Sequence, residues 1–109
     1  MTPQDALASM PKKIKVGPHT YIVRIVENLQ GDMAEIDTDA QSIEIVSSAA
    51  SAPQVVGRLV HELLHAIWQD RDLGKRADEE RVVLQYESGL IQLFQDNPKL
   101  LTWIRRGLK

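Results

Sequence analysis

One segment of the sequence combines residue types and a spacing that are typical of metal-dependent hydrolysis, His61-Glu62-Leu63-Leu64-His65. On a helix, residues four positions apart lie one turn above each other, so both imidazoles can reach one metal ion. Glu62 stands one position further round the helix, where it can contact a metal-bound water without binding the metal. In zinc hydrolases of this pattern, the metal activates the water and the glutamate passes its proton to the leaving amine. The motif therefore predicts zinc-dependent peptide hydrolysis, with His61 and His65 as metal ligands and Glu62 as general base.

A zinc site with two histidines needs a third protein ligand and an open position for water. The chain has no cysteine, and His19 is remote in sequence and is predicted to be a surface strand residue. A carboxylate from the next helix is the natural third ligand, and the candidates are Asp78, Glu79, Glu80 and Glu87. Periodicity favours Glu79, which lies on the axis of that helix's apolar stripe, while Glu80 and Glu87 lie at its margin.

The competing interpretation of the motif is an ordinary solvent-facing stretch of an amphipathic helix. The apolar arc of this helix contains Val56, Leu59, Val60, Leu63 and Ile67, and the three motif side chains lie largely opposite it. Leu64 and Trp68, however, extend the apolar character to the edge of the histidine line. Apolar side chains at this position are expected if another element of the fold packs against that edge of the helix.

Helical periodicity begins after Ser48 and defines three helices. Ser51-Ala-Pro-Gln54 is a helix-start signature and predicts the motif helix at about residues 53–69. A second helix is predicted from about residue 78 to residue 96. Asn97 as N-cap and Pro98 at the first helical position then begin a short C-terminal helix.

The preceding region alternates with a period close to two, which predicts strands. Turn residues at 17–18, 30–32 and 37–39 separate the apolar alternations, so we expect three or four short antiparallel strands in a hairpin meander. Strands followed by helices indicate an α+β domain over residues 12–109. Residues 1–11, which contain two prolines, are predicted to be a loose N-terminal arm with one helical turn at most.

Composition limits the possible partners of the chain. Its 109 residues carry a net charge of -2, which argues against the broad positive field that nucleic-acid or anionic-membrane binding requires. The basic C-terminal run 103–109 is predicted to be a favourable helix end. No apolar run of membrane-spanning length and no signal peptide are visible, so we expect a cytoplasmic protein without direct nucleic-acid or membrane binding.

The succession of these segments resembles small phage and prophage proteins that are grouped with the ImmA/IrrE-type zinc metallopeptidases. The resemblance extends from about Ile14 to Pro98, and the HExxH motif and Asp96-Asn97-Pro98 are its most specific parts. The other segments that carry it are Glu35-Ile36-Asp37, Ile43-Glu44-Ile45, Glu79-Glu80-Arg-Val-Val and the run that begins at Gly89. The resemblance implies a minimal zincin-like metallopeptidase.

The resemblance also bears on the third ligand. In the family, this ligand is a glutamate at the head of a helix, followed by small or apolar residues three, six and seven positions later. Glu80 is followed by Val83, Tyr86 and Glu87, so it matches at the first two positions and departs at the third. The family pattern thus favours Glu80, slightly ahead of the Glu79 that periodicity favours.

The resemblance implies further that a peptide substrate lies extended along the edge strand of the sheet, expected at Ser42–Ser47. The target would be a protein, such as a repressor or a host regulatory protein, in the bacterial cytoplasm. A catalytically silent interaction protein that binds a partner through its sheet edge, with a purely structural metal, is the alternative.

Overall fold

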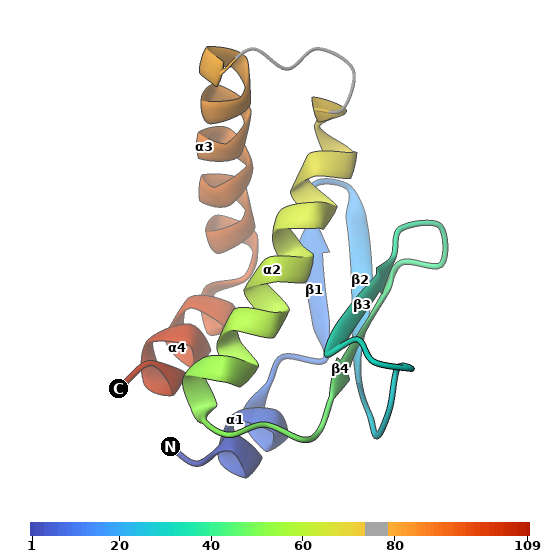
Figure 1. The fold of residues 1–109 in the computed structure, drawn as a ribbon. Coiled ribbons are helices and arrows are strands. Elements are labelled where there is room, and N and C mark those ends of the chain that lie inside the picture. The colour runs from blue at the N-terminus through green and yellow to red at the C-terminus, as the bar shows by residue number, and fades with distance from the viewer. Residues whose placement is uncertain (74–78) are drawn as a thin grey trace.

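The computed structural model describes residues 1–73 and 79–109, in which a short helix is followed by the strands and then by three more helices (Figure 1). The elements are α1 (Pro3–Ser9), β1 (Lys13–Val16), β2 (His19–Val26), β3 (Ala34–Asp37), β4 (Ser42–Val46), α2 (Ala52–Asp70), α3 (Glu79–Asp96) and α4 (Pro98–Gly107). This arrangement confirms the predicted α+β class. No helix in the described ranges is long and apolar enough to cross a membrane.

The four strands form one sheet in the order β1-β2-β4-β3. β1 with β2 and β3 with β4 are antiparallel pairs, but β2 and β4 run parallel, so the expected antiparallel meander is wrong at this pairing. Ile43 and Ile45 of β4 are fully buried, whereas Glu35 and Asp37 of β3 are exposed. The more apolar strand therefore occupies the centre and the charged strand the edge, a common protection of sheet edges.

α2 lies across one face of the sheet, and α3 runs back beside it in the opposite direction (Figure 1). α2 begins as predicted, since the Ser51 hydroxyl accepts a hydrogen bond of 3.3 Å from the Gln54 backbone N–H. Its apolar side chains, Val55, Leu59, Leu63 and Ile67 among them, pack into the same core as Ile14, Ile43 and Ile45. The motif helix is thus held by the core along its length.

The N-terminal segment is not the loose arm that its prolines suggested. The Thr2 hydroxyl accepts a bond of 3.0 Å from the Asp5 N–H, and the Asp5 carboxylate accepts one of 3.2 Å from the Thr2 N–H. These bonds with Thr2 also hold the pKa of Asp5 below its usual value. Ala6 and Leu7 are buried, and the Trp103 indole donates a bond of 2.9 Å to the Ala6 carbonyl. Reciprocal capping and these contacts make two helical turns part of the core.

Asn97 occupies the predicted N-cap position of α4, but its side chain does not cap that helix. It bonds instead to the backbone of Lys15 in β1, accepting from the N–H at 2.9 Å and donating to the carbonyl at 2.7 Å. It also donates to the Leu93 carbonyl at 2.8 Å. The α3–α4 junction is therefore tied to the sheet edge opposite β3.

Candidate metal centre

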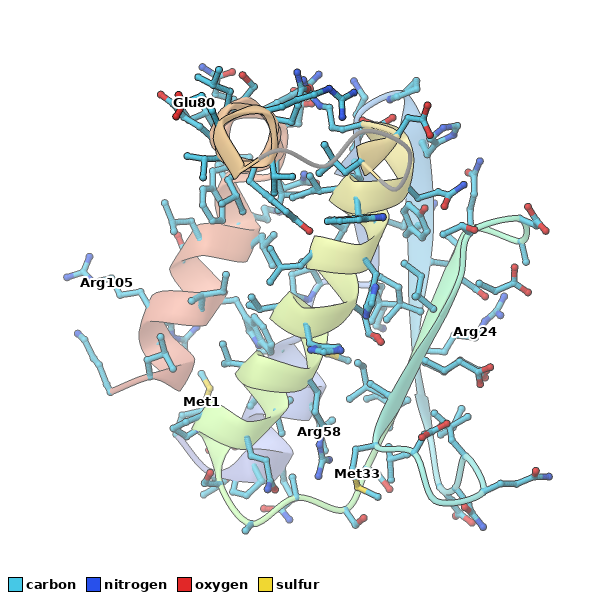
Figure 2. The ribbon with its side chains drawn as sticks, turned by 45° about the horizontal axis from the view of Figure 1, so that its top comes forward. Met1, Arg24, Met33, Arg58, Glu80 and Arg105 are labelled. Carbon is cyan, nitrogen blue, oxygen red and sulfur yellow. The ribbon has the colours of Figure 1, made fainter. Side chains whose placement is uncertain are left out.

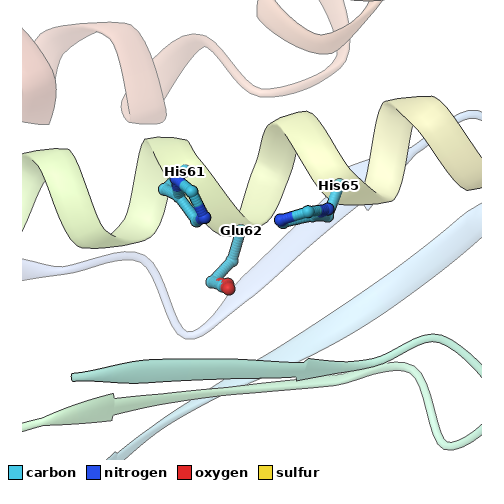
Figure 3. Close-up of side chains that lie close together, drawn as sticks. All are labelled: His61, Glu62 and His65. Atoms are coloured by element: carbon cyan, nitrogen blue, oxygen red, sulfur yellow. The ribbon is translucent and has the colours of Figure 1, made fainter. Parts of the chain in front are cut away.

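α2 brings together the three side chains of the motif (Figure 3). His61, Glu62 and His65 each offer a ligand atom, and these atoms lie within 4.8 Å of one another, with the imidazole centroids 4.9 Å apart. Both imidazoles are exposed, whereas Glu62 is only 5% exposed. In the described part of the chain, this is the one such group that could hold a metal ion. Two imidazoles and a carboxylate are donors that transition metals accept.

Glu62 is buried because strand β3 approaches this side of α2, toward which its side chain points (Figure 3). Among the described residues, none hydrogen-bonds its buried Oε2 atom. Burial raises the pKa of Glu62, the two motif histidines oppose that rise, and the Asp32 and Glu35 carboxylates add to it. A buried oxygen without a partner is costly unless a ligand, a metal-bound water or a proton satisfies it. The helical periodicity of the sequence, which places Glu62 largely opposite the apolar arc, did not predict this burial.

The structure does not bring the favoured third ligand to this group. Glu80 is exposed at the N-terminal end of α3 (Figure 2). Glu87 is exposed on the same helix, and neither glutamate belongs to the group that His61, Glu62 and His65 form. Asp78 and the side chain of Glu79 lie outside the described residues. His19 is exposed, as predicted, and its Nδ1 lies 3.0 Å from Gln41 Nε2.

The register of α3 against α2 explains the position of Glu80. The Tyr86 hydroxyl donates a bond of 3.2 Å to the Leu64 carbonyl, and Gly89 lies against Ile67. Glu80 precedes Tyr86 by six residues, or about 9 Å of helix. The family pattern fixed a spacing along α3, whereas the contacts of Tyr86 and Gly89 fix which turn of α3 faces the motif.

A cavity of about 350 Å³ separates the motif from the sheet edge. Its lining comes from one stripe of α2 and from the start of β3, namely Gly57, Arg58, His61, Glu62, Asp32, Met33 and Ala34. Figure 2 shows Arg58 on α2 and Met33 on the segment that enters β3. The Arg58 guanidinium donates to the carbonyls of Val46 and Ser48, at 3.0 and 2.6 Å, and so fixes the chain that leaves β4.

β3 rather than β4 offers a free backbone edge beside this cavity, so Ser42–Ser47 is not the edge strand. The Val46 N–H donates to the Met33 carbonyl at 3.0 Å, which makes this a hydrogen-bonded pair of the ladder. Along an antiparallel ladder, hydrogen-bonded and non-hydrogen-bonded pairs of residues alternate. The N–H and C=O groups of Ala34 and Ile36 therefore point away from β4. No other backbone group in the described ranges pairs with them.

A second cavity, of about 370 Å³, lies on the other side of the histidine pair, between α2 and α3. It is lined by His61, Leu64, His65, Trp68 and Tyr86. The Trp68 and Tyr86 rings are 6.4 Å apart and tilted by 43°, and burial raises the pKa of the Tyr86 hydroxyl. Leu64 and Trp68 had suggested a covering element, and α3 is that element. Helical periodicity places Tyr86 in the apolar stripe of its helix, but it does not show which residue of α2 the side chain contacts.

In comparisons with known proteins, no protein-family model, no curated protein and no solved structure matches the chain. The functional argument therefore rests on the geometry of the site and on the residues that form it.

Proposed function

We propose that the protein is a zinc-dependent metallopeptidase. One observation carries the proposal: a buried glutamate with an unpartnered carboxylate oxygen lies beside two exposed imidazoles one helical turn apart. A solvent-facing stretch of an amphipathic helix would leave Glu62 hydrated. The burial of this one carboxylate, at a position where zinc hydrolases require a base, supports the catalytic interpretation over the solvated one.

His61 and His65 would hold the metal, and zinc suits them because it binds imidazole nitrogen and the chain has no thiolate. When bound, zinc would supply Lewis acidity and lower the pKa of a coordinated water to about 7. Glu80, Glu79, Asp78 and the less favoured Glu87 remain predictions for the third ligand. For Glu80 to serve, α3 would have to shift toward the motif from the register that Tyr86 and Gly89 define.

Glu62 would act as the general base. Its burial raises its pKa, which strengthens the carboxylate as a proton acceptor and later as a donor to the leaving amine. Because its Oε2 atom has no hydrogen-bond partner among the described residues, that oxygen is free to accept a proton.

The substrate would be an extended peptide added to the free edge of β3. Ala34 and Ile36 would supply backbone hydrogen bonds, and Ala34 lines the same cavity as His61 and Glu62, so a peptide bond at this edge would pass close to the base. The motif resemblance supports the remainder of the proposal. The chain would be a phage or prophage relative of the ImmA/IrrE-type peptidases, acting on a repressor or host regulatory protein in the bacterial cytoplasm.

The experiment combines metal analysis with cleavage of a denatured protein substrate. We expect one zinc per chain in the wild type, loss of zinc in His61→Ala, and retention of zinc without cleavage in Glu62→Gln. His19→Ala, which changes an exposed histidine remote from the motif, is the matched control and should behave as wild type. Substoichiometric zinc in the wild type, or equal zinc in His61→Ala, would contradict the proposal.

The same variants test the silent interaction protein. The free edge of β3 could pair with a partner strand whatever the chemistry of the motif, and this is the observation that favours that alternative. A biological effect that survives Glu62→Gln, together with zinc binding and no cleavage, would favour the interaction protein with a structural metal.

Zinc affinity also separates the candidate third ligands. Glu79→Gln and Glu80→Gln remove one carboxylate each from neighbouring positions. Whichever closes the site should weaken zinc binding by 10-fold or more, while the other leaves it unchanged. Unchanged affinity in both would point to Asp78, to Glu87 or to coordination without a ligand from this part of the chain.

A further inference from the structure

The cavity between α2 and α3 has one wall built from a single stripe of α2. His61, Leu64, His65 and Trp68 stand at positions i, i+3, i+4 and i+7, which share one face of a helix. The two imidazoles that form the candidate metal centre are therefore also the floor of this cavity. Any group bound in it lies immediately beside the metal ligands.

Tyr86 is the residue of α3 that lines the opposite side of the cavity. The hydroxyl of Tyr86 is already engaged by the Leu64 carbonyl, so the ring presents its face and edge rather than a free polar group. Trp68 completes the rim as the one large aromatic side chain exposed in the described part of the chain, at 36%.

His61 lines both this cavity and the one along β3, whereas Glu62 lines only the β3 side and His65 only the α3 side. A peptide that runs along the β3 edge would therefore have its backbone on the side of the base. A side chain next to the cleaved bond can extend past His61 into the space between the helices.

On the basis of the proposed function, we infer that this cavity is a specificity subsite for a large apolar or aromatic side chain adjacent to the cleaved bond. Its volume of about 370 Å³ accommodates a phenyl or isobutyl group. Offset or edge-to-face contact with Trp68 and Tyr86 favours an aromatic ring. Filling the cavity removes exposed apolar surface from both partner and protein. A charged side chain would lose hydration against the apolar surfaces of Leu64, Trp68 and Tyr86.

The experiment uses the zinc-loaded protein and a set of peptides that carry Phe, Leu, Ala or Asp at one position and are otherwise identical. We expect kcat/KM for Phe and Leu to exceed that for Ala by about 10-fold or more at one fixed position beside the cleaved bond, with Asp poorest. Trp68→Ala should reduce the preference for Phe over Ala to less than about threefold. Leu101→Ala, which truncates an exposed side chain on α4, is the matched control and should retain the preference. If Trp68→Ala fails to fold, Trp68→Leu should keep the preference for Leu and lose part of that for Phe.

A binding measurement separates this inference from the proposed function. With zinc-loaded Glu62→Gln, the Phe peptide should bind about 10-fold more tightly than the Ala peptide and shift the Trp68 emission. Trp68→Phe in the same background should remove that shift, leaving the buried Trp103 as the remaining tryptophan. Cleavage without an apolar preference would contradict the subsite and still support the proposed peptidase activity. If no peptide is cleaved, the peptidase fails, and the binding preference alone then decides the subsite: equal binding of Phe and Ala peptides overturns it.

Discussion

The two long helices have similar lengths and amphipathic sequences, yet the fold uses them differently. α2 buries eight side chains, from Ala52 to Ile67. Among the residues of α3 whose burial is described, only Gly89 and Leu93 are buried, and Val83, Leu84 and Ile91 are 50–54% exposed. The motif residues therefore stand on a helix that the core fixes, as a preorganised site requires. Tyr86, which lines the second cavity, and the predicted third ligand belong to α3, the helix with fewer buried residues.

Few contacts attach α3 to α2 midway along the pair. Tyr86 bonds to Leu64, Gly89 lies against Ile67, and Arg71 reaches Gln92 at 2.8 Å. Regions with fewer buried apolar contacts open at lower free energy than the core. A shift of α3 could also change the distance between its carboxylates and the motif histidines.

Truncating an apolar side chain on each helix should reveal the largest difference. Leu59→Ala in α2 removes a fully buried side chain and should lower the free energy of unfolding by about 2–5 kcal/mol, since it leaves a cavity in the core. Leu84→Ala in α3 removes one that is 50% exposed and should change it by about 0.5 kcal/mol or less. Urea unfolding followed by circular dichroism measures both. Similar losses in the two variants would show that α3 is packed as firmly as α2.

The helices could be predicted from local signals, since Ser51, the Asn97-Pro98 pair and the 3.6-residue period each act within one element. The sheet could be predicted only in part. Period two identifies the face of a strand, but not which neighbour it pairs with. The parallel pairing of β2 with β4 depends on the burial of Ile43 and Ile45, which is a property of the assembled core.

The site divides in the same way. The proximity of His61 and His65 follows from helical spacing and was predictable. The burial of Glu62 depends on β3, and the distance of Glu80 depends on the register set by Tyr86 and Gly89, so neither follows from residue spacing alone. The reciprocal caps of α1 were a local signal in Thr2 and Asp5, obscured by the neighbouring prolines.

The glycines of the two helices test the contact between them. A Cβ on Gly89 would lie 2.7 Å from Cγ2 of Ile67, a stiff, buried side chain, whereas one on Gly57 would meet nothing within 4 Å. Gly89→Ala should therefore destabilise the protein by about 1–2 kcal/mol through overpacking. Gly57→Ala should stabilise it by about 0.5–1 kcal/mol through helix propensity. The midpoint temperatures of thermal unfolding should shift in opposite directions in the two variants. A higher midpoint for Gly89→Ala would mean that the two helices separate readily.

The smallest effect concerns the polar contact at the end of α2. Gln92→Ala removes the acceptor that Arg71 Nη2 reaches at 2.8 Å, and a bond to a charged, partly buried group contributes about 1 kcal/mol or somewhat more. Because this hydrogen bond joins α3 to the end of α2, and α3 buries less of its surface than α2, the loss should concentrate in α3. Native-state hydrogen exchange should show the α3 amides opening at a free energy lower by about 1 kcal/mol, with the α2 amides from Leu59 to Ile67 nearly unchanged. Gln95→Ala, an exposed position on the same helix, is the matched control. Equal acceleration of exchange in both helices would mean that α2 and α3 open as one unit, and that the site and the wall of its apolar cavity share one stability.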